Sequence, residues 1–364
     1  MQLSDLDTPA LVIDLEIMER NLARMADYAA AHALRLRPHT KTHKIPALAR
    51  RQLDLGAVGL TVAKVGEAEV MQASGSPELL VAYPIIGRTK LDRLCTLNPA
   101  MELTESLDSE VAAKQLSDAA AAAGRTIQVL AEVDVGLGRV GVTPGESLRT
   151  LAEAINRLPG LQFAGIAFYP GHIKRMDEEA TGLLRRLGTL LDQAIGDLER
   201  AGFPVRIVSG GSTPTLLRSH EVSRLNEIRP GTYIFNDWNT VACGACAIED
   251  CAAAVLTTVV STSVQDQIII DGGSKTFSSD RLQGSAEPSF GYLQASPEAV
   301  FGKMNEEHGF IDIRETGRTW SVGDKIRLIP NHVCVAVNLH EQVYGLRGDT
   351  VEEIWRVEAR GKLQ

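Results

Sequence analysis

Residues 101–135 read MELTESLDSEVAAKQLSDAAAAAGRTIQVLAEVDV and contain one complete strand–helix–strand unit. Short apolar runs at 101–108 and 127–135 predict strands, and the amphipathic stretch at 109–123 predicts the helix between them. Strands that alternate with helices in this way form parallel neighbours in a sheet. The stretch therefore predicts an α/β fold.

The same alternation extends in both directions from this unit. Further amphipathic stretches occupy residues 44–55 and 176–201. In all, the candidate strands are residues 34–41, 59–64, 78–84, 101–108, 127–135, 161–170, 205–212 and 226–235. Eight such units in about 200 residues are typical of a (β/α)8 TIM-type barrel. An open doubly wound sheet more often has fewer strands, so we favour the barrel.

The pattern differs at the two ends of the chain. A strand at residues 8–14 and a helix at 15–31 precede the first barrel strand. After residue 235 the chain is rich in β-branched runs, and the strands expected there are residues 255–261, 267–271, 325–329, 333–337 and 350–357. We therefore predict a barrel domain at 15–235 and a mostly β domain at 236–364, joined by the N-terminal strand in residues 1–14.

Composition excludes several classes of protein. The chain has 364 residues, and its formal charge of −9 argues against a nucleic-acid binder, which needs clustered cations. No apolar run reaches the roughly 18 residues that span a membrane, and the N-terminus lacks the pattern of a signal peptide. Five cysteines, an odd number spread along the chain, argue against a disulfide framework. We expect a soluble enzyme of the cytoplasm.

The densest group of reactive side chains is Arg35-Leu-Arg-Pro-His-Thr-Lys-Thr-His-Lys44. It follows the first predicted barrel strand, at the end of the barrel where such enzymes place their catalytic groups. His39 and His43 flank Lys41, and nearby cations lower the pKa of a lysine. Such a lysine suits Schiff-base chemistry. A basic patch at the start of the following helix is the alternative.

Two glycine-rich turns also follow predicted strands. Asp134-Val-Gly-Leu-Gly-Arg-Val-Gly141 matches the dinucleotide pattern weakly, because Arg139 stands where the backbone must approach a pyrophosphate. Ser209-Gly-Gly-Ser-Thr-Pro-Thr215 lies between a strand and an expected helix, where it could hold a phosphate. Arg229-Pro-Gly-Thr-Tyr233 follows the next strand, and barrel phosphate sites often use these last two loops. Plain tight turns are the alternative.

A third group, Pro330-Asn-His-Val-Cys334, leads into the strand predicted at 333–337. On a strand, His332 and Cys334 would project from one face, and an imidazole with a thiolate could hold Zn²⁺. A buried cysteine beside a hydrogen-bonded histidine is the alternative. The group formed by Cys243, Cys246 and Cys251 lacks a second pair of metal ligands, so we interpret it as structural.

Taken together, these groups resemble the D-threonine aldolase and D-serine dehydratase family of fold-type III pyridoxal-phosphate (PLP) enzymes, whose barrel is shared with alanine racemase. The residues that carry the resemblance are Leu6-Asp-Thr-Pro-Ala-Leu-Val-Ile-Asp14, Arg37-Pro-His-Thr-Lys-Thr-His-Lys44, Glu132-Val-Asp-Val-Gly-Leu-Gly-Arg139, Gly210-Gly-Ser-Thr-Pro-Thr215, Arg229-Pro-Gly-Thr-Tyr233, Asn305-Glu-Glu-His-Gly309, Pro330-Asn-His-Val-Cys334 and Trp355-Arg-Val-Glu-Ala-Arg-Gly-Lys362. They extend over nearly the whole chain.

The resemblance implies a role for each group. Lys41, in the motif with His39, would form the internal aldimine with PLP, and Arg139 would contact the phenolic oxygen side. The phosphate would be held by residues of two loops, namely Gly210, Gly211, Ser212, Thr213, Gly231 and Tyr233. His332 and Cys334 would bind a divalent metal, Zn²⁺ or else Mn²⁺ or Mg²⁺. The resemblance also implies a homodimer that acts on a small D-3-hydroxy amino acid.

The reaction itself stays open between two members of the family. His332-Val-Cys334 and Ser212-Thr-Pro-Thr215 resemble the dehydratases, whereas Val337-Asn-Leu-His340 and Ala359-Arg-Gly-Lys362 resemble the aldolases. Tyr169 matches an aldolase tyrosine, and His172 stands in for a displaced histidine as the candidate base. We favour D-threonine aldolase over a dehydratase of D-serine or D-3-hydroxyaspartate. A racemase, a non-catalytic PLP carrier and a nicotinamide-dependent oxidoreductase are weaker alternatives.

Overall fold

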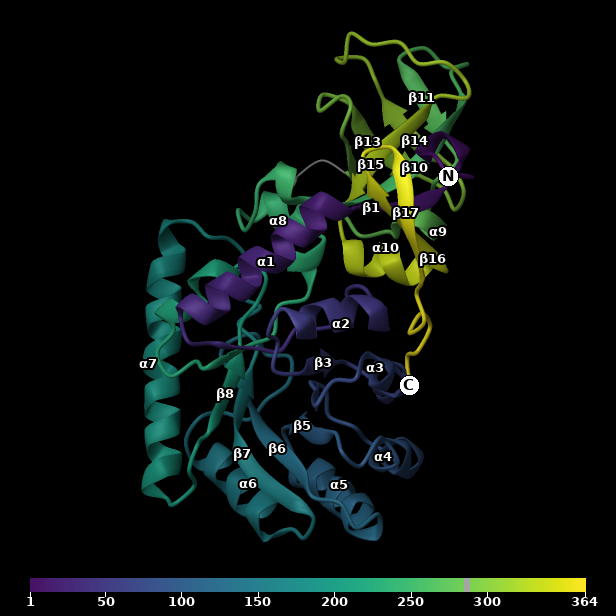
Figure 1. Cartoon of the computed structure of the whole chain (residues 1–364). Coiled ribbons are helices and arrows are strands. Elements are labelled where there is room, and N and C mark those ends of the chain that lie inside the picture. Colours follow the sequence, from purple (N-terminus) through teal and green to yellow (C-terminus); the bar gives the residue numbers. More distant parts are fainter. Residues whose placement is uncertain (285–288) are drawn as a thin grey trace. The chain divides into compact units, whose positions relative to one another are not determined.

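The computed structural model describes residues 1–284 and 289–364, and these form two compact units (Figure 1). The β unit comprises Met1–Arg24, Thr42–Ile45 and Thr232–Arg360. The barrel unit comprises Met25–Lys41, Pro46–Gly231 and Gly361–Gln364. The domain bounds expected from sequence, 15–235 and 236–364, stay a prediction.

The barrel unit is built on a parallel sheet of eight strands among its described residues, in the order β2-β9-β8-β7-β6-β5-β4-β3. Every one of these strands lies within a predicted run, so the predicted fold is confirmed. Their bounds are β2 (Arg35–Leu36), β3 (Leu60–Val62), β4 (Glu78–Val81), β5 (Glu102–Leu107), β6 (Ile127–Val133), β7 (Leu161–Phe168), β8 (Ile207–Gly210) and β9 (Glu227–Ile228).

Backbone hydrogen bonds also join the two ends of this strand order. The Thr61 N–H donates to the Pro38 carbonyl (2.8 Å), and the Thr40 N–H donates to the Thr61 carbonyl (2.9 Å). His39 and Thr61 form a parallel bridge at the same place. The chain just beyond β2 therefore pairs with β3 and closes the sheet on itself.

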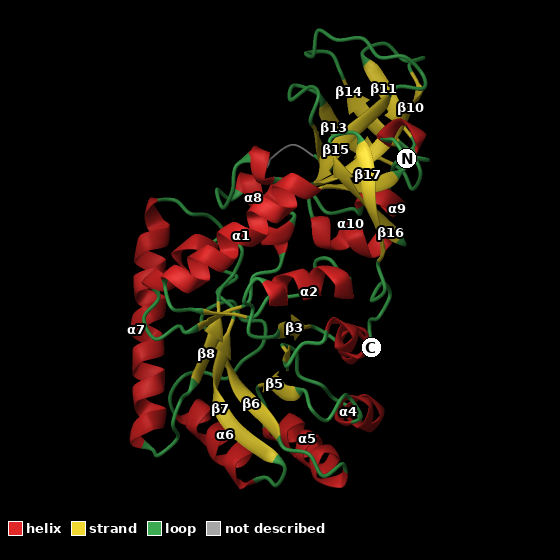
Figure 2. Ribbon diagram, viewed as in Figure 1, coloured by secondary structure: helices red, strands yellow, loops and turns green. Residues whose placement is uncertain are grey.

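Helices alternate with these strands along the chain (Figure 2). They include all three amphipathic stretches that the sequence singled out. Their bounds are α1 (Leu15–Ala31), α2 (Pro46–Asp54), α3 (Val65–Met71), α4 (Arg88–Cys95), α5 (Glu110–Ala122), α6 (Glu146–Arg157) and α7 (Glu178–Arg200). Side-chain caps set two of the starts: Ser109 Oγ accepts the Ala112 N–H, and Asp177 Oδ1 accepts the Glu179 N–H.

The buried sheet of the barrel unit carries charged side chains. Arg37 is 1% exposed, and its Nε lies 2.9 Å from Glu227 Oε2. Burial works to lower the pKa of Arg37, but the charges of Glu227 and Glu78 raise it overall. Burial likewise works to raise the pKa of Glu227, and Arg37 lowers it overall. Both members of the pair are therefore charged, and each depends on the other, because an unpaired buried charge is costly.

Glu105 on β5 is a buried carboxyl group of a different kind. Its Oε1 accepts the Ile85 N–H (2.9 Å), while its Oε2 finds no hydrogen-bond partner among the described residues. Burial raises the pKa of Glu105 to about 8. The folded protein therefore holds a proton on this side chain near neutral pH, where an unfolded chain would release it.

This proton makes a testable contribution to stability. The contribution of Glu105 is fully present below the ordinary carboxyl pKa, and it is lost as the pH rises to about 8. Each pKa unit corresponds to about 1.4 kcal/mol. The test is the free energy of urea unfolding, measured between pH 5 and 9. Its decline with pH should be shallower in Glu105→Gln than in the wild type. Substitution of the exposed Glu102 on the same strand, Glu102→Gln, should leave the decline unchanged. Parallel curves for wild type and Glu105→Gln would show that Glu105 is ionised in the fold.

The β unit contains the second sheet, with nine strands among its described residues. Its main path is β13-β14-β11-β10-β1-β16-β17, and β15 pairs with both β10 and β12. The strands are β1 (Ala10–Asp14), β10 (Ala253–Ser261), β11 (Gln267–Ile270), β12 (Gly291–Leu293), β13 (Val300–Met304), β14 (Gly309–Asp312), β15 (Lys325–Pro330), β16 (Gln342–Arg347) and β17 (Thr350–Arg356). Strand β1 lies between β10 and β16, which confirms that the N-terminal strand joins this sheet.

The strand predicted at 333–337 is wrong, because this segment is helix α10 (Val333–Leu339). The β-branched valines indicated a strand, but the segment is helical and a carboxylate distant in sequence bonds its first amide. Asp237 Oδ2 accepts the Val333 N–H (3.0 Å) and so satisfies the first amide of the helix. Other short α-helices in the described part of this unit are α8 (Trp238–Ala242) and α9 (Ser274–Phe277). No helix in the described ranges is long and apolar enough to cross a bilayer.

Candidate active site

The predicted cofactor residues of the barrel unit follow the carboxyl ends of its strands. Lys41 follows β2, Arg139 follows β6, and Tyr169 comes directly after β7. Gly210 ends β8, and Gly231 follows β9. Because all these strands are parallel, their carboxyl ends lie at one end of the barrel, where barrel enzymes place their active sites.

Lys41 has an exposed side chain, so its amine is accessible to a soluble aldehyde. Its backbone N–H donates to His39 Nδ1 (3.4 Å), and the His39 N–H donates to the Pro230 carbonyl (2.8 Å). His39 therefore links the chain next to Lys41 to the loop after β9. This arrangement holds the backbone at Lys41 while the side chain extends to solvent.

The turn after β8 is tightly packed and lined by hydroxyl groups. A Cβ on Gly210 would lie 2.3 Å from the Phe168 ring, and Gly211 has a φ of +98°, so both positions favour glycine. The Ser212 N–H donates to Thr215 Oγ1 (3.1 Å). The helix that follows this turn is a short 3₁₀ helix, Leu216–Glu221.

Small residues and hydroxyls of this kind fit a phosphate group, because they leave room for close approach of its oxygens. Tyr233 is buried in a short 3₁₀ helix, Thr232–Ile234. It belongs to the β unit, whereas Gly210–Thr213 belong to the barrel unit. The phosphate role of these residues stays a prediction.

Arg139, Tyr169 and His172 form a cluster between the loops after β6 and β7. The guanidinium carbon of Arg139 lies 4.7 Å from the centre of the Tyr169 ring, a cation–π contact. A Cβ on Gly136 would lie 3.5 Å from His172 Cε1, so the imidazole packs on that glycine. His172 Nδ1 is buried and has no hydrogen-bond partner among the described residues. A buried ring nitrogen of this kind is suited to a polar ligand.

The proposed metal residues lie at the start of α10 in the β unit. His332 precedes the helix and Cys334 is in its first turn, so the expected arrangement on one strand face is wrong. The two side chains nevertheless share a hydrogen bond. Cys334 Sγ lies 3.2 Å from Thr42 Oγ1, and His332 Nδ1 lies 3.1 Å from Asp280 Oδ2.

Charge around His332 is predominantly negative. The hydrogen bond with Cys334 raises the pKa of His332 to about 9, against the opposing effect of burial. Asp237 and Asp280 raise it further. An imidazole and a thiol in contact, with a carboxylate orienting the imidazole, form a donor set suited to Zn²⁺. No group of three metal-ligating side chains occurs in the part of the chain that the structure describes.

Sequence reasoning missed the residues that support this pair. Asp280 lies 52 positions before His332 in an irregular segment, and no pattern there indicates the contact. Thr42 stands next to Lys41 in the sequence, and nothing there indicated its contact with Cys334. Asp237 could have been singled out from sequence, because Asp is a common residue at the start of a helix. In the structure its Oδ1 accepts the Thr240 N–H at the start of α8 (2.8 Å).

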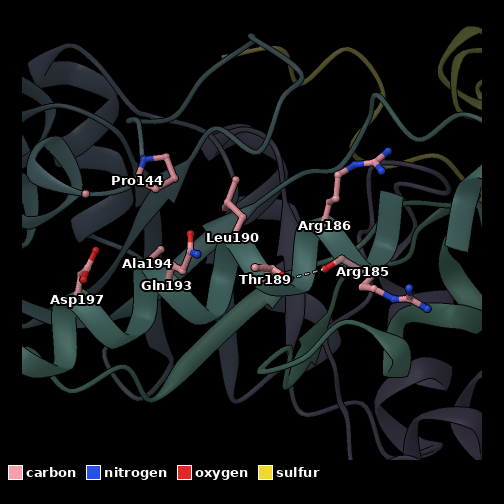
Figure 3. A pocket seen from close by; sticks show the side chains of 9 residues that line it. Pro144, Arg185, Arg186, Thr189, Leu190, Gln193, Ala194 and Asp197 are labelled. Atoms are coloured by element: carbon pink, nitrogen blue, oxygen red, sulfur yellow. Dashed lines mark hydrogen bonds between the residues drawn. The ribbon is translucent and has the colours of Figure 1, made fainter. Parts of the chain in front are cut away.

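A hollow of about 570 Å³ on the barrel unit is a different feature (Figure 3). It runs along α7, where Thr189 Oγ1 donates to the Arg185 carbonyl (3.1 Å), and Pro144 and Gly145 lie beside it. None of the predicted site residues lines it. We therefore do not assign the chemistry to this hollow.

The fold and these residues define a class of protein. A parallel eight-stranded barrel with a lysine after its first strand, continued by a β unit, is the architecture of fold-type III PLP enzymes. In agreement, residues 13–237 match the family "Alanine racemase, N-terminal domain". Residues 252–346 match the family "Putative serine dehydratase domain".

Individual relatives narrow the class. The chain is 32% identical to a D-threonine aldolase of an Arthrobacter species, over 99% of this chain and 94% of that protein. The crystal structure of a D-threonine aldolase from Filomicrobium marinum superposes with a TM-score of 0.93, at 34% identity and with 100% and 98% of the two chains covered. The D-threo-3-hydroxyaspartate dehydratase from Delftia sp. HT23 gives 0.88 at 31% identity, with 98% of each chain covered. The chain belongs to the D-threonine aldolase and D-serine dehydratase family of PLP-dependent lyases.

Proposed function

We propose that this lyase is a D-threonine aldolase, which cleaves D-3-hydroxy amino acids into glycine and an aldehyde with the help of PLP and a divalent metal. The contact of His332 with Cys334 and with Asp280, in a chain whose barrel presents an exposed lysine, supports the metal-assisted PLP chemistry that aldolases and dehydratases share. The observation that carries the choice of the aldolase is the structural likeness. The likeness to the Filomicrobium aldolase exceeds that to the Delftia dehydratase in both TM-score and identity, which favours the aldolase reaction.

The residues that would hold PLP come from the ends of the barrel strands. Lys41 would bind the aldehyde carbon through its Nζ, with His39 beside it and Arg139 facing the phenolic oxygen. The phosphate would be held by Gly210, Gly211, Ser212, Thr213, Gly231 and Tyr233. The turn after β8 fits such a group, because its small residues and hydroxyl side chains allow phosphate oxygens to approach the backbone.

The chemistry is then divided between the bound groups and the chain. When bound, PLP withdraws electrons from the substrate and the metal polarises its 3-hydroxyl group. His332 and Cys334 would hold the metal and so determine where the hydroxyl lies. A ring nitrogen of His172 would accept the hydroxyl proton as the Cα–Cβ bond breaks, and Arg139 would hold Tyr169 beside it.

Dehydration is the second candidate, because the same residues could remove the hydroxyl group instead. The thiol of Cys334 favours it, since the sequence resembles the dehydratases at this position. In that reaction a base takes the Cα proton, and a 2-oxo acid and ammonia are released. The outcome would depend on which substrate bond the surrounding residues orient for cleavage, and on which side chain acts as the base.

A product assay tests the proposal. The protein is incubated with PLP and D-threonine or D-serine, with and without Zn²⁺, Mn²⁺ or Mg²⁺. We expect glycine and acetaldehyde from D-threonine, and loss of activity when metal is chelated. Ammonia without glycine would contradict the aldolase proposal and support the dehydratase. We also expect a homodimer, which sedimentation of the same sample would test.

A further inference from the structure

Two threonine hydroxyls lie near the sulfur of Cys334 in the β unit. Thr42 Oγ1 is 3.2 Å from Cys334 Sγ, and Thr232 Oγ1 is 3.9 Å from it. The two threonines come from segments far apart in the chain, because Thr42 directly follows Lys41, whereas Thr232 begins a 3₁₀ helix. The fold therefore places hydroxyl groups beside one member of the proposed metal pair.

The hydroxyl of Thr42 is buried, so its hydrogen needs a partner within the protein. Thr42 is 0% exposed, and a buried hydroxyl that makes no hydrogen bond is costly. The Cys334 sulfur is the partner that the described structure provides, with either atom able to donate. A cysteine that binds a metal is a thiolate and has lost its hydrogen. In the metal-bound protein, Thr42 is therefore the donor.

We propose that Thr42 is a positioning residue, which donates a hydrogen bond to the Cys334 thiolate and so strengthens the binding of Zn²⁺. The proposal rests on the proposed function, because it takes Cys334 as a metal ligand. Cys334 is half-buried, so water compensates the charge of its thiolate only in part. A donor at 3.2 Å supplies the missing compensation and holds the sulfur in one direction.

The other proposed ligand has a partner of the opposite kind. His332 Nδ1 lies 3.1 Å from Asp280 Oδ2, and a metal-binding histidine commonly donates its second ring N–H to a carboxylate. A carboxylate is an acceptor and carries negative charge, so it suits the imidazole and would repel a thiolate. A hydroxyl can donate and carries no charge, so it suits the sulfur of Cys334. Each ligand therefore has the neighbour that its metal-bound form requires.

The two hydroxyls differ in how strongly they should act. Thr232 Oγ1 is the more distant from the sulfur, at 3.9 Å against 3.2 Å for Thr42 Oγ1. Thr232 is also half-buried, so water can reach it, whereas Thr42 is fully buried. Removal of the Thr42 hydroxyl should therefore have the larger effect on Cys334.

The affinity for Zn²⁺ is the first test, measured on the full-length PLP-bound protein by competition with a zinc-chelating dye. Thr42→Val keeps the shape of the side chain and removes its hydroxyl, and we expect about tenfold weaker binding. Thr42→Ser keeps the hydroxyl and should bind as the wild type does. The matched control is Thr257→Val. Thr257 is an equally buried threonine of β10 whose hydroxyl donates to the Ile326 carbonyl (3.4 Å), so this variant should also match the wild type.

Co²⁺ in place of Zn²⁺ tests whether the hydroxyl acts on the sulfur itself. The wild type should show a sulfur-to-cobalt charge-transfer band in the difference spectrum before and after Co²⁺ is added, and Cys334→Ala should lack it. A donated hydrogen bond lowers the energy of the sulfur electrons. Its loss in Thr42→Val should therefore move the band to longer wavelength, and Thr232→Val should move it less.

The outcomes separate this inference from the function on which it rests. A wild-type band and wild-type affinity in Thr42→Val would overturn the role of Thr42. Equal loss of affinity in Thr42→Ser and Thr42→Val would also overturn it, because packing would then explain the effect. Thr42→Ala removes the same hydroxyl and gives the same comparison if the valine variant does not fold. A wild type without the band, or Cys334→Ala with the same band, would contradict the proposed metal site and this inference with it.

Discussion

Replacing Lys41 with alanine is expected to abolish the yellow colour of the protein with PLP and to reduce turnover below detection. The reason is that Lys41 is the exposed lysine that follows β2, next to a histidine that holds its backbone. Without its amine, PLP has no covalent anchor in the barrel. The measurement is the absorbance spectrum of the purified protein after PLP is added and the excess is removed.

The control for this variant is Lys114→Ala. Lys114 is an exposed lysine on α5 that pairs with Asp118 (3.0 Å), and such exposed pairs contribute about 0.5 kcal/mol or less. It should keep both colour and turnover. If the yellow colour survives in Lys41→Ala, another lysine anchors the cofactor, and the assignment of the loop after β2 is wrong.

The second large effect is expected for Cys334→Ala, which should lose the bound metal and most of the turnover while PLP stays bound. Cys334 Sγ contacts both His332 and Thr42 at the start of α10, so its removal leaves the imidazole as the remaining donor of the pair. Elemental analysis of the purified variant measures the metal, and the visible spectrum measures PLP. The two readouts separate metal loss from unfolding.

A second substitution at the same position sharpens this test. Cys334→Asp replaces a soft sulfur donor with a hard oxygen donor, and oxygen ligands suit Mn²⁺ and Mg²⁺ better than a thiolate does. We expect turnover to return with a preference moved from Zn²⁺ towards Mn²⁺. If Cys334→Ala keeps wild-type metal content and turnover, His332 and Cys334 are packing residues and the metal is held elsewhere.

The barrel could be predicted because its strands are local patterns. Runs such as 101–108 and 127–135 are short, apolar and regularly spaced, and their burial on both sides leaves few alternatives to a parallel sheet. The prediction of a strand at 333–337 was wrong for the opposite reason. Its valines favour a strand, but the carboxylate that begins α10 comes from Asp237, almost a hundred residues earlier.

Some residues of the candidate site could likewise be predicted from sequence, and others could not. Lys41 and the turn at Gly210 carry their chemistry in contiguous motifs, so they could be singled out from sequence alone. The contact of Asp280 with His332, and that of Thr42 with Cys334, join segments that only the fold brings together.

The most direct test of the central claim is the amount of glycine formed for each D-threonine consumed. The holoenzyme with PLP and metal is incubated with D-threonine, and glycine, acetaldehyde, 2-oxobutanoate and ammonia are all quantified, with L-threonine as the control substrate. We predict one glycine and one acetaldehyde for each D-threonine consumed, and neither from L-threonine. One ammonia and one 2-oxobutanoate for each D-threonine, without glycine, would contradict the aldolase assignment.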